Sequence, residues 1–563
     1  MRYDEVLTHI GEFGTYQRIQ YILLAITSLT SAWHSMNMVF VGATPDHHCK
    51  IPDQYRTHYG NISETQLYNL SLPTELKDGN TRYKRCQMYH LINNTDDLYN
   101  RSEQACTNGW VYSKEKYQRT IVSDWNLVCG DIGLRSSASS IFFAGRLVGA
   151  LMFGQLSDFV GRKLSFFIAV VLQCAIGTGA AFSPSLIIFY VLYFFQGVMQ
   201  VGVYLSAYVL GSEILGPKFR TYWGVGNQYF YAIGQMLLAL LGYLIRDWRY
   251  IEIAISAPLV LYLTYWWLVP ESPRWLLVQD RTKEAKAIIR KTAKVNRVDV
   301  SEKILDSLTA DTVDPSGKAH SVIDLFRNWK IISLSLLVWL GWLINALVYY
   351  GLGLNTRNLA GDPYLNFFFS GLVEIPGVAV VHLTIDRFGR KPVLCGFMLF
   401  GGLACICTSF IPTNLSWLAT LLAMIGKFAI TGSYAVIYLV ATEVFPTCVR
   451  NVGCGMASMS ARIGGILAPQ IVLLGEYVRF LPFLIYGGLS IGAALLMLLL
   501  PETRGRPLPQ TMEDMYNYSK RPTEEESKDG KDNIAFQMDN ITDNALNAPI
   551  LCKDTTQLNA TKL

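Results

Sequence analysis

Long uncharged hydrophobic runs alternate with polar segments along most of this 563-residue chain. Residues 331–343 and 481–500 contain no Lys, Arg, Asp or Glu. The second run is long enough to cross a bilayer, which takes roughly 20 residues. A soluble protein with many such runs would aggregate, so the pattern predicts membrane-spanning helices.

Hydropathy predicts twelve spans in two sets of six, which makes the chain an all-α integral membrane protein. The first set is 21–41, 137–153, 164–182, 186–210, 222–244 and 250–268. The second set is 331–354, 364–385, 393–411, 417–440, 452–474 and 481–500. The first run is too long for a cleavable signal peptide and follows the acidic pair Asp4 and Glu5, so we expect it to remain as a helix.

A polar segment at about 43–134 separates the first two spans. It contains Cys49, Cys86, Cys106 and Cys129 and the glycosylation sequons at Asn61, Asn69, Asn93 and Asn100. An even cysteine count beside several sequons predicts an extracellular loop with two disulfides; the alternative is a cytosolic loop with free thiols and chance sequons. Four cysteines allow three pairings, among which the sequence does not choose.

The outward first loop and the even number of spans place both termini in the cytoplasm. The N-terminal half, 21–268, then follows a cytoplasmic segment, 1–20, and precedes a basic cytoplasmic linker, 269–330, with short surface helices. The C-terminal half, 331–500, precedes a polar segment, 501–563, for which we predict disorder.

Composition removes several classes of protein. The chain is 51% hydrophobic and 16% charged with a mean hydropathy of +0.25, which excludes a series of soluble domains. The net charge of +5 does not indicate a nucleic-acid partner, because the basic residues gather between hydrophobic runs, as the positive-inside rule expects. Eleven cysteines are too few and too scattered for a disulfide scaffold.

Three pairs of motifs recur at nearly one period. GQLSDFVGRK after the second span, with Asp158 and Arg162, corresponds to TIDRFGRK after the eighth, with Asp386 and Arg390, an offset of 228 (386 minus 158). SEILGPKFR, with Glu213 and Arg220, corresponds to TEVFPTCVR, with Glu443 and Arg450, an offset of 230 (443 minus 213). PESPRWLL corresponds to PETRGRPL, with Glu271 and Glu502 offset by 231. The repetition indicates two homologous six-span halves.

These motifs resemble those of the major facilitator superfamily. The cysteine-bearing first loop together with PESPRWLL resembles its organic cation, anion and zwitterion transporter family. The resemblance extends from GEFGTYQR near the N-terminus to PETRG after the last span. It implies the major facilitator fold, with twelve transmembrane helices in two six-helix pseudo-repeats and a large extracellular loop after the first helix.

The repeated charges predict a cytoplasmic latch. An Arg beside an Asp at a helix end can form charge-assisted hydrogen bonds to the neighbouring span, and these must break when the halves rock apart. The residues assigned to it are Asp158, Arg162, Glu213, Arg220, Asp386, Arg390, Glu443 and Arg450. The alternative is that they only anchor helix ends.

Four ionisable residues lie deep in predicted spans, where such residues usually face a cavity: Arg146, Glu374, Lys427 and Arg462. Glu374 and Lys427 can neutralise each other, which leaves two arginines without an obvious partner. An unpaired guanidinium in a cavity is a bidentate site for a carboxylate.

The charged residues of the predicted spans distinguish between branches of the resembled family. At Arg462 its cation-selective branch carries aspartate, whereas the anion and carnitine branches carry arginine. The anion branch has a lysine where this chain has Val378, four residues after Glu374. The charge pattern is therefore closest to the carnitine branch.

Aromatic residues match family positions that line the central cavity. They are Tyr204, Trp342, Tyr349, Tyr434 and Tyr438, and Gln228 matches a cavity glutamine. Tyr434 and Tyr438 lie four apart and share one helical face. Quaternary ammonium groups bind such faces by roughly 0.5–2 kcal/mol each, although helix packing is an equally common role.

We therefore expect a polyspecific plasma-membrane transporter of small organic ions, foremost zwitterions and cations such as carnitine-like betaines. An organic anion exchanger, of the nicotinate, urate or monocarboxylate type, is the alternative, while a channel, a receptor and a membrane enzyme are less favoured. The chain has no phosphate-binding loop, and His47 and His48 beside Cys49 do not make a complete zinc-ligand set. We expect no cofactor and no metal, and the sequence leaves open whether transport is coupled to Na⁺ or H⁺.

The C-terminal Thr561, Lys562 and Leu563 resemble a ligand of PDZ scaffold domains. An unbound tail and, more weakly, a peroxisomal address are the alternatives. Besides this scaffold, the expected partners are the substrate and the lipid bilayer, with the protein functional as a monomer.

Overall fold

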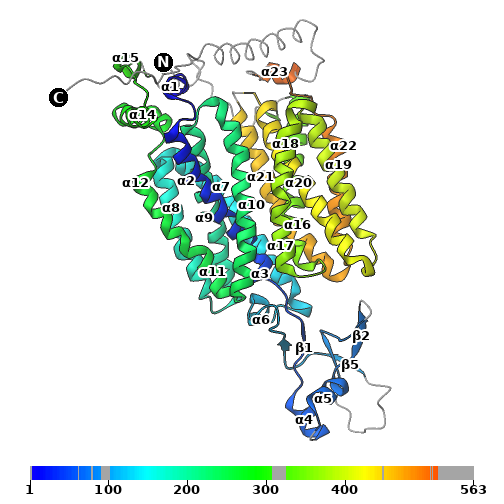
Figure 1. The fold of residues 1–563 in the computed structure, drawn as a ribbon. Coiled ribbons are helices and arrows are strands. Elements are labelled where there is room, and N and C mark those ends of the chain that lie inside the picture. Colours follow the sequence, from blue (N-terminus) through cyan, green and yellow to red (C-terminus); the bar gives the residue numbers. More distant parts are fainter. Residues whose placement is uncertain are drawn as a thin grey trace, which may run out of the picture.

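A computed structural model describes residues 3–60, 62–77, 80–90, 102–306, 308, 325–326, 328–446, 449–506, 509 and 512–517. Figure 1 shows a bundle of long helices with a small domain at one end and short helices at the other. We call the small domain, residues 43–131, the loop domain, and the end of the bundle that carries it the loop end. The opposite end, which carries the segment that joins the two halves, is the linker end.

The first half contains the first six predicted spans. Its helices are α2 (Thr15–Met36), α3 (Met38–Val41), α7 (Ile132–Val160), α8 (Arg162–Ala181), α9 (Leu186–Ile214), α10 (Pro217–Ile245), α11 (Trp248–Ser256), η2 (Ala257–Thr264) and α12 (Tyr265–Leu268). Within it α7 and α8 pack against α9, and α2 packs against α10.

The second half repeats this arrangement. Its helices are α16 (Trp329–Asn355), η4 (Thr356–Asn358), α17 (Pro363–Leu372), α18 (Glu374–Phe388), α19 (Arg390–Ser409), η5 (Thr413–Leu415), α20 (Ser416–Val444), α21 (Arg450–Tyr477) and α22 (Leu481–Met497). The halves meet where α7 packs against α21 and α10 against α17. The fold is therefore the predicted helical membrane fold with two related halves.

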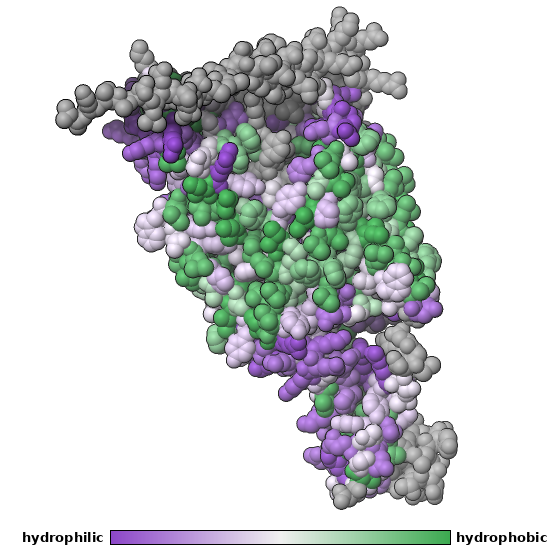
Figure 2. Space-filling view, viewed as in Figure 1, coloured by the Kyte–Doolittle hydropathy of each residue, from purple (hydrophilic) through white to green (hydrophobic). Residues whose placement is uncertain are grey.

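Hydrophobic residues cover the middle of the bundle, and hydrophilic residues gather at its two ends (Figure 2). Ten of the twelve predicted spans fall in helices that are long and apolar enough to cross a membrane. The first and last predicted spans are the exceptions. Helix α2 has many buried polar side chains, Gln17, Gln20, Ser28 and His34 among them, and α22 has only 17 residues. The first span can be this polar because its polar side chains contact other helices and not lipid.

Three predicted spans are not continuous α-helices. The first is divided at Asn37 into α2 and α3. The eighth is divided at Val373 into α17 and α18, and Pro376, which has no N–H to donate to Leu372, follows the break. The sixth changes to the 3₁₀ helix η2 at Pro258. Pro258 and Pro376 account for the interruptions of the sixth and eighth spans, which the hydropathy pattern does not register.

Short strands and helices build the loop domain. They are β1 (His47–Cys49), α4 (Asp53–Tyr59), α5 (Glu64–Ser71), β2 (Thr74–Lys77), β3 (Asn80–Tyr83), β4 (Gln87–Tyr89), β5 (Glu103–Ala105), β6 (Trp110–Tyr112), α6 (Ile121–Trp125) and η1 (Cys129–Asp131). The strands pair antiparallel as β1 with β6, β2 with β3 and β4 with β5.

The loop domain contains both predicted disulfides. Cys49 pairs with Cys106 and Cys86 with Cys129, which selects one of the three possible pairings. Of the four predicted glycosylation sites, only Asn69, exposed on α5, lies among the described residues, since Asn61, Asn93 and Asn100 lie outside them. Glycosylation stays a prediction.

Five short helices lie at the linker end: α1 (Tyr3–Ile10), α13 (Pro273–Val278), α14 (Thr282–Asn296), α15 (Glu302–Asp306) and α23 (Met512–Asn517). A small hydrophobic core holds α1, α13 and α14 together. Helix α23 falls within the segment for which we predict disorder, and the Lys330 ammonium lies 4.3 Å from the centroid of its Tyr516 ring. That segment therefore includes at least one helix docked on the bundle.

Candidate substrate cavity

A cavity of about 510 Å³ lies between the two halves. Side chains from α7, α9 and α10 line it on one side and from α16, α18, α20 and α21 on the other. It extends from Glu374 near mid-height to Ser212, Thr442 and Arg450, which lie at the linker ends of their helices. The cavity therefore reaches the linker end.

Contacts between the halves close the bundle at the loop end. Ser140 on α7 donates a hydrogen bond to the Ile466 carbonyl of α21 at 2.8 Å, and Gln470 donates to Ser140 at 3.0 Å. Nearer the loop domain, Arg135 forms an ion pair with Glu476 at 3.0 Å. The structure is thus closed at the loop end while its cavity reaches the linker end.

Nine of the ten predicted substrate-binding residues line this one cavity: Arg146, Tyr204, Gln228, Trp342, Tyr349, Glu374, Tyr434, Tyr438 and Arg462. The tenth, Lys427, lies behind Glu374 and pairs with it. The sequence pattern therefore brings together residues that are up to 316 positions apart (462 minus 146). Their role in binding stays a prediction.

The predicted Glu374–Lys427 ion pair is present, with the ammonium 3.0 Å from the carboxylate. Glu374 is 3% exposed and Lys427 is 1% exposed. Gln235 and Tyr349 also donate hydrogen bonds to the carboxylate, at 2.7 and 2.8 Å. The Lys427 ammonium lies 3.3 Å from the centroid of the Tyr349 ring. Glu374, the one acid among the described lining residues, is therefore already neutralised and hydrogen-bonded.

The two cavity arginines have no carboxylate partner among the described residues. Arg146 donates to the Tyr350 hydroxyl at 2.9 Å, and its guanidinium lies 5.4 and 5.5 Å from the Phe143 and Tyr350 ring centroids. Arg462 donates to the Ser458 carbonyl at 2.6 Å and to its hydroxyl. The Nε atoms of both arginines are buried without a hydrogen-bond partner. Arg146 and Arg462 thus have no compensating carboxylate in the part of the chain that the structure describes, and each has donor capacity left for an anion.

Four of the five predicted aromatic residues form a continuous wall. The Trp342 and Tyr438 ring centroids lie 4.1 Å apart, Tyr438 and Tyr434 lie 5.4 Å apart, and Tyr434 stacks on Tyr349 at 5.6 Å. Tyr438 is 40% exposed although it lies inside the bundle, because it borders the cavity. A wall of this kind can contact a quaternary ammonium group through several ring faces.

Several cavity residues are absent from the predicted set: Ser31, Tyr208, Asn227, Tyr231, Tyr350 and Ser458. Helical spacing from a predicted residue could have identified two of them. Tyr231 lies three residues after Gln228, and Ser458 lies four residues before Arg462, so each pair shares a helix face. Tyr350 follows Tyr349 directly, and only the packing of α7 against the second half explains its contact with Arg146.

The predicted latch residues form two matching clusters at the linker end. In the first half Arg162 contacts Asp158 at 3.0 Å and Glu213 at 3.2 Å. In the second half Arg390 contacts Asp386 and Glu443, both at 3.2 Å. Each cluster joins neighbouring helices of one half, and none of these pairs connects the two halves. Opening of the clusters during transport stays a prediction.

Two latch residues remain. Arg450 donates to the Phe445 carbonyl at 3.1 Å instead, and its Nη2 is buried without a partner at the edge of the cavity. The side chain of Arg220 lies outside the described residues.

The third repeated motif has a role that its sequence does not reveal. Glu271 accepts hydrogen bonds from the backbone N–H groups of Arg162 and Lys163, and Glu502 does the same for Arg390 and Lys391. Each glutamate therefore satisfies the free N–H groups at the start of a helix, α8 or α19. Gly161 and Gly389, at φ 100° and 94°, precede these helices, and a Cβ at either position would collide with the glutamate.

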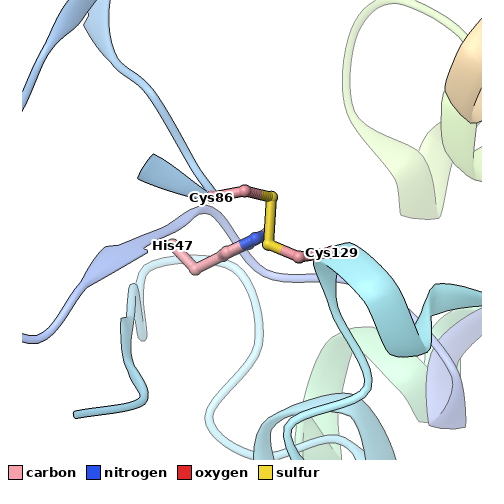
Figure 3. Close-up of side chains that lie close together, drawn as sticks. All are labelled: His47, Cys86 and Cys129. Carbon is pink, nitrogen blue, oxygen red and sulfur yellow. A yellow bond between two sulfur atoms is a disulfide. The ribbon is translucent and has the colours of Figure 1, made fainter. Parts of the chain in front are cut away.

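One cluster of potential metal ligands occurs in the loop domain. His47 lies beside Cys86 and Cys129, as Figure 3 shows. The two sulfur atoms are bonded to each other, so neither is a thiolate. This cluster is a disulfide with a histidine packed against it.

Comparison with known proteins agrees with this geometry. Residues 99–515 match the family described as "Sugar (and other) transporter". The chain is 42% identical over 543 residues to the organic cation transporter protein of Drosophila melanogaster, covering 94% of this chain and 97% of that protein. It is 37% identical to the human organic cation/carnitine transporter 2, with 91% and 94% covered. The chain belongs to the organic cation, anion and zwitterion transporter family of the major facilitator superfamily. It is therefore a membrane transporter and not an enzyme.

Solved structures agree on the fold. A partially occluded inward-open conformation of the xylose transporter XylE from E. coli superposes with a TM-score of 0.57 at 18% identity. The match covers 88% of this chain and 100% of that one. The major facilitator fold inferred from the internal repeat is confirmed.

Proposed function

We propose that this transporter carries small organic ions that bear a carboxylate, foremost zwitterions such as carnitine-like betaines, by alternating access across the plasma membrane. The observation that carries the proposal is the uncompensated pair Arg146 and Arg462 beside the aromatic wall. A substrate carboxylate supplies the missing negative charge, and a guanidinium binds it bidentately. A quaternary ammonium group on the same molecule faces Tyr434 and Tyr438.

Neutralisation of Glu374 supports a zwitterion over a simple cation. A cation in this cavity would face two unpaired arginines, while the acid that could attract it is held by Lys427 at 3.0 Å. Like charges in a poorly screened cavity repel. The names of the relatives, an organic cation transporter and an organic cation/carnitine transporter, also favour organic ions as substrates.

The second candidate is an organic anion exchanger. It draws on the same two arginines, because a substrate with only a carboxylate would satisfy them without using the aromatic wall. An anion of the nicotinate or urate type has a flat ring that can stack on Trp342 or Tyr438 instead. Discrimination between the two candidates therefore requires substrates that differ in the ammonium group.

An uptake panel tests the proposal. Cells that express the chain are given carnitine, ergothioneine, tetraethylammonium, nicotinate or urate, with and without Na⁺ and at several pH values. We expect saturable uptake of carnitine or ergothioneine that a trans gradient of the same substrate accelerates. Uptake of nicotinate or urate alone would establish the anion exchanger, and uptake that never saturates would indicate a channel.

The remaining expectations complete the proposal. The loop end faces the extracellular medium and the linker end the cytoplasm, which puts the disulfides in an oxidising compartment. The protein acts as a monomer, and dependence of uptake on Na⁺ or pH identifies any coupling ion.

The C-terminal Thr561, Lys562 and Leu563, which lie outside the described residues, bind a PDZ scaffold. Deletion of Leu563 should then reduce retention at the cell surface.

A further inference from the structure

A second cavity, of about 600 Å³, lies at the loop end, and no residue that lines it also lines the substrate cavity. We call it the loop-end pocket. Three parts of the molecule contribute to it: the loop domain, α7 of the first half, and the loop ends of helices of the second half. It is separate from the site to which the proposed function refers.

Basic side chains dominate the lining of the loop-end pocket. They are Arg82, Arg85, Lys116, Arg135, Arg357 and Arg479. The acids are Asp46, Glu115 and Glu476. Among the described lining residues, six bases thus face three acids. Two of the acids are already in ion pairs, Asp46 with Arg85 at 2.7 Å and Glu476 with Arg135 at 3.0 Å.

Two of these bases, Arg135 and Arg357, lie near one carboxylate, that of Glu476, and only Arg135 forms an ion pair with it. Arg135 is 1% exposed and also donates a hydrogen bond to the Thr44 hydroxyl. Arg357 interacts electrostatically with Arg135 and Glu476, and its guanidinium donates a hydrogen bond to the Gly42 carbonyl at 3.2 Å. The Nε atoms of both arginines are buried without a partner. Burying two guanidinium groups beside one carboxylate is costly unless another anion compensates them.

We propose that the loop-end pocket binds a small oxyanion, with carboxylate or sulfate groups, and that the bound anion favours the conformation in which the loop end is closed. Guanidinium groups bind such anions through paired, charge-assisted hydrogen bonds. Arg135 belongs to the first half and Arg357 to the second. An anion between them therefore attracts both halves, and it loses one of its partners when the halves separate at the loop end. A ligand with higher affinity for one conformation shifts the population toward it.

Binding is tested on the purified full-length protein by calorimetric titration with citrate or sulfate at constant ionic strength. We expect saturable binding that Arg357→Gln weakens about tenfold, the loss expected for charge-assisted hydrogen bonds, with Arg357→Lys intermediate. Arg56→Gln is the matched control, because Arg56 is an exposed loop-domain arginine paired with Glu64 outside the pocket. Absence of saturable binding, or equal affinity of the wild type and Arg357→Gln, would overturn the proposal.

Lys116→Gln is the second variant, used if Arg357→Gln is not monodisperse, because Lys116 is an exposed residue of the pocket lining. We expect it to weaken citrate binding several-fold, and unchanged affinity would count against the site. The titration contains no transported substrate, so its outcome does not depend on the proposed function.

The proposed effect of the anion on closure of the loop end has its own test. Cysteines in place of Ser140 and Gln470, which are hydrogen-bonded across the closed loop end, report closure by forming a disulfide. We expect saturating citrate to accelerate this cross-link in the wild-type pocket and not with Arg357→Gln. An equal cross-linking rate with and without citrate would refute the effect on conformation.

Discussion

The buried ion pair of Glu374 and Lys427 gives the prediction with the largest expected energy. Its charges are 3.0 Å apart, which corresponds to an attraction of about 5.5 kcal/mol at an effective dielectric constant of about 20. Loss of either charge leaves the other buried and unpaired. We therefore expect Glu374→Gln or Lys427→Met to lower the free energy of unfolding by about 3–5 kcal/mol.

The double variant separates the ion pair from other effects of the substitutions. Glu374→Gln with Lys427→Met removes both charges and keeps similar volumes, and replacement of a whole buried pair is often neutral. We expect it to be more stable than either single variant. The control is Arg290→Met, which breaks the exposed pair with Glu302 and should cost no more than about 1 kcal/mol.

Unfolding of the purified protein in mixed micelles with increasing SDS provides the measurement, with surface expression in cells as a second readout. The four proteins of the cycle give the coupling energy directly. Additive losses, with the double variant less stable than both single variants, would refute the reasoning. Such a result would mean that the two charges do not stabilise each other.

Further predictions concern the cavity wall and the loop domain. Tyr438→Leu should raise the KM for a quaternary ammonium zwitterion about 2- to 30-fold, because a cation–π contact next to Trp342 is lost. Anion uptake should change little, and Tyr438→Phe should be close to wild type. Burial lowers the pKa of His47, so at low pH this residue binds a proton more readily in the unfolded chain than in the folded one. Stability should therefore fall as the pH drops below about 6.5. His47→Gln should flatten this pH dependence, measured by thermal unfolding from pH 7.5 to pH 5. Replacement of Cys86 and Cys129 by serine removes a disulfide that spans 43 residues and should lower the free energy of unfolding by about 4 kcal/mol. We expect reduced surface expression, and expression at the wild-type level would contradict this prediction.

Periodic and repeated features of this chain could be predicted from its sequence. The duplicated Asp158 and Asp386 motifs indicate the two halves, because equivalent helix ends need equivalent charges. Charges within spans, such as Glu374 and Lys427, indicate the cavity because an ion in a hydrophobic run must have a partner or water. These inferences depend on local sequence and on the high cost of buried charge.

Other features depend on packing between distant segments. The contact of Arg146 with Tyr350 exists only because α7 packs against the second half. The loop-end pocket likewise requires Arg135 and Arg357, which are 222 residues apart (357 minus 135), to meet beneath the loop domain. Hydropathy contains no information on such meetings. It also does not indicate why α2 is polar, whose buried polar residues contact other helices.

Charge reversal at Arg462 tests most directly the claim that the cavity arginines bind a substrate carboxylate. Uptake of a zwitterion, an anion and a cation is measured for Arg462→Asp, Arg462→Lys and the exposed loop-domain control Arg56→Asp, each normalised to surface expression. We predict that Arg462→Asp abolishes uptake of the zwitterion and the anion and confers weak uptake of the cation, because attraction becomes repulsion. Arg462→Lys should be intermediate, since it keeps the charge and loses the bidentate geometry. Unchanged substrate preference in a well-expressed Arg462→Asp protein would contradict the account.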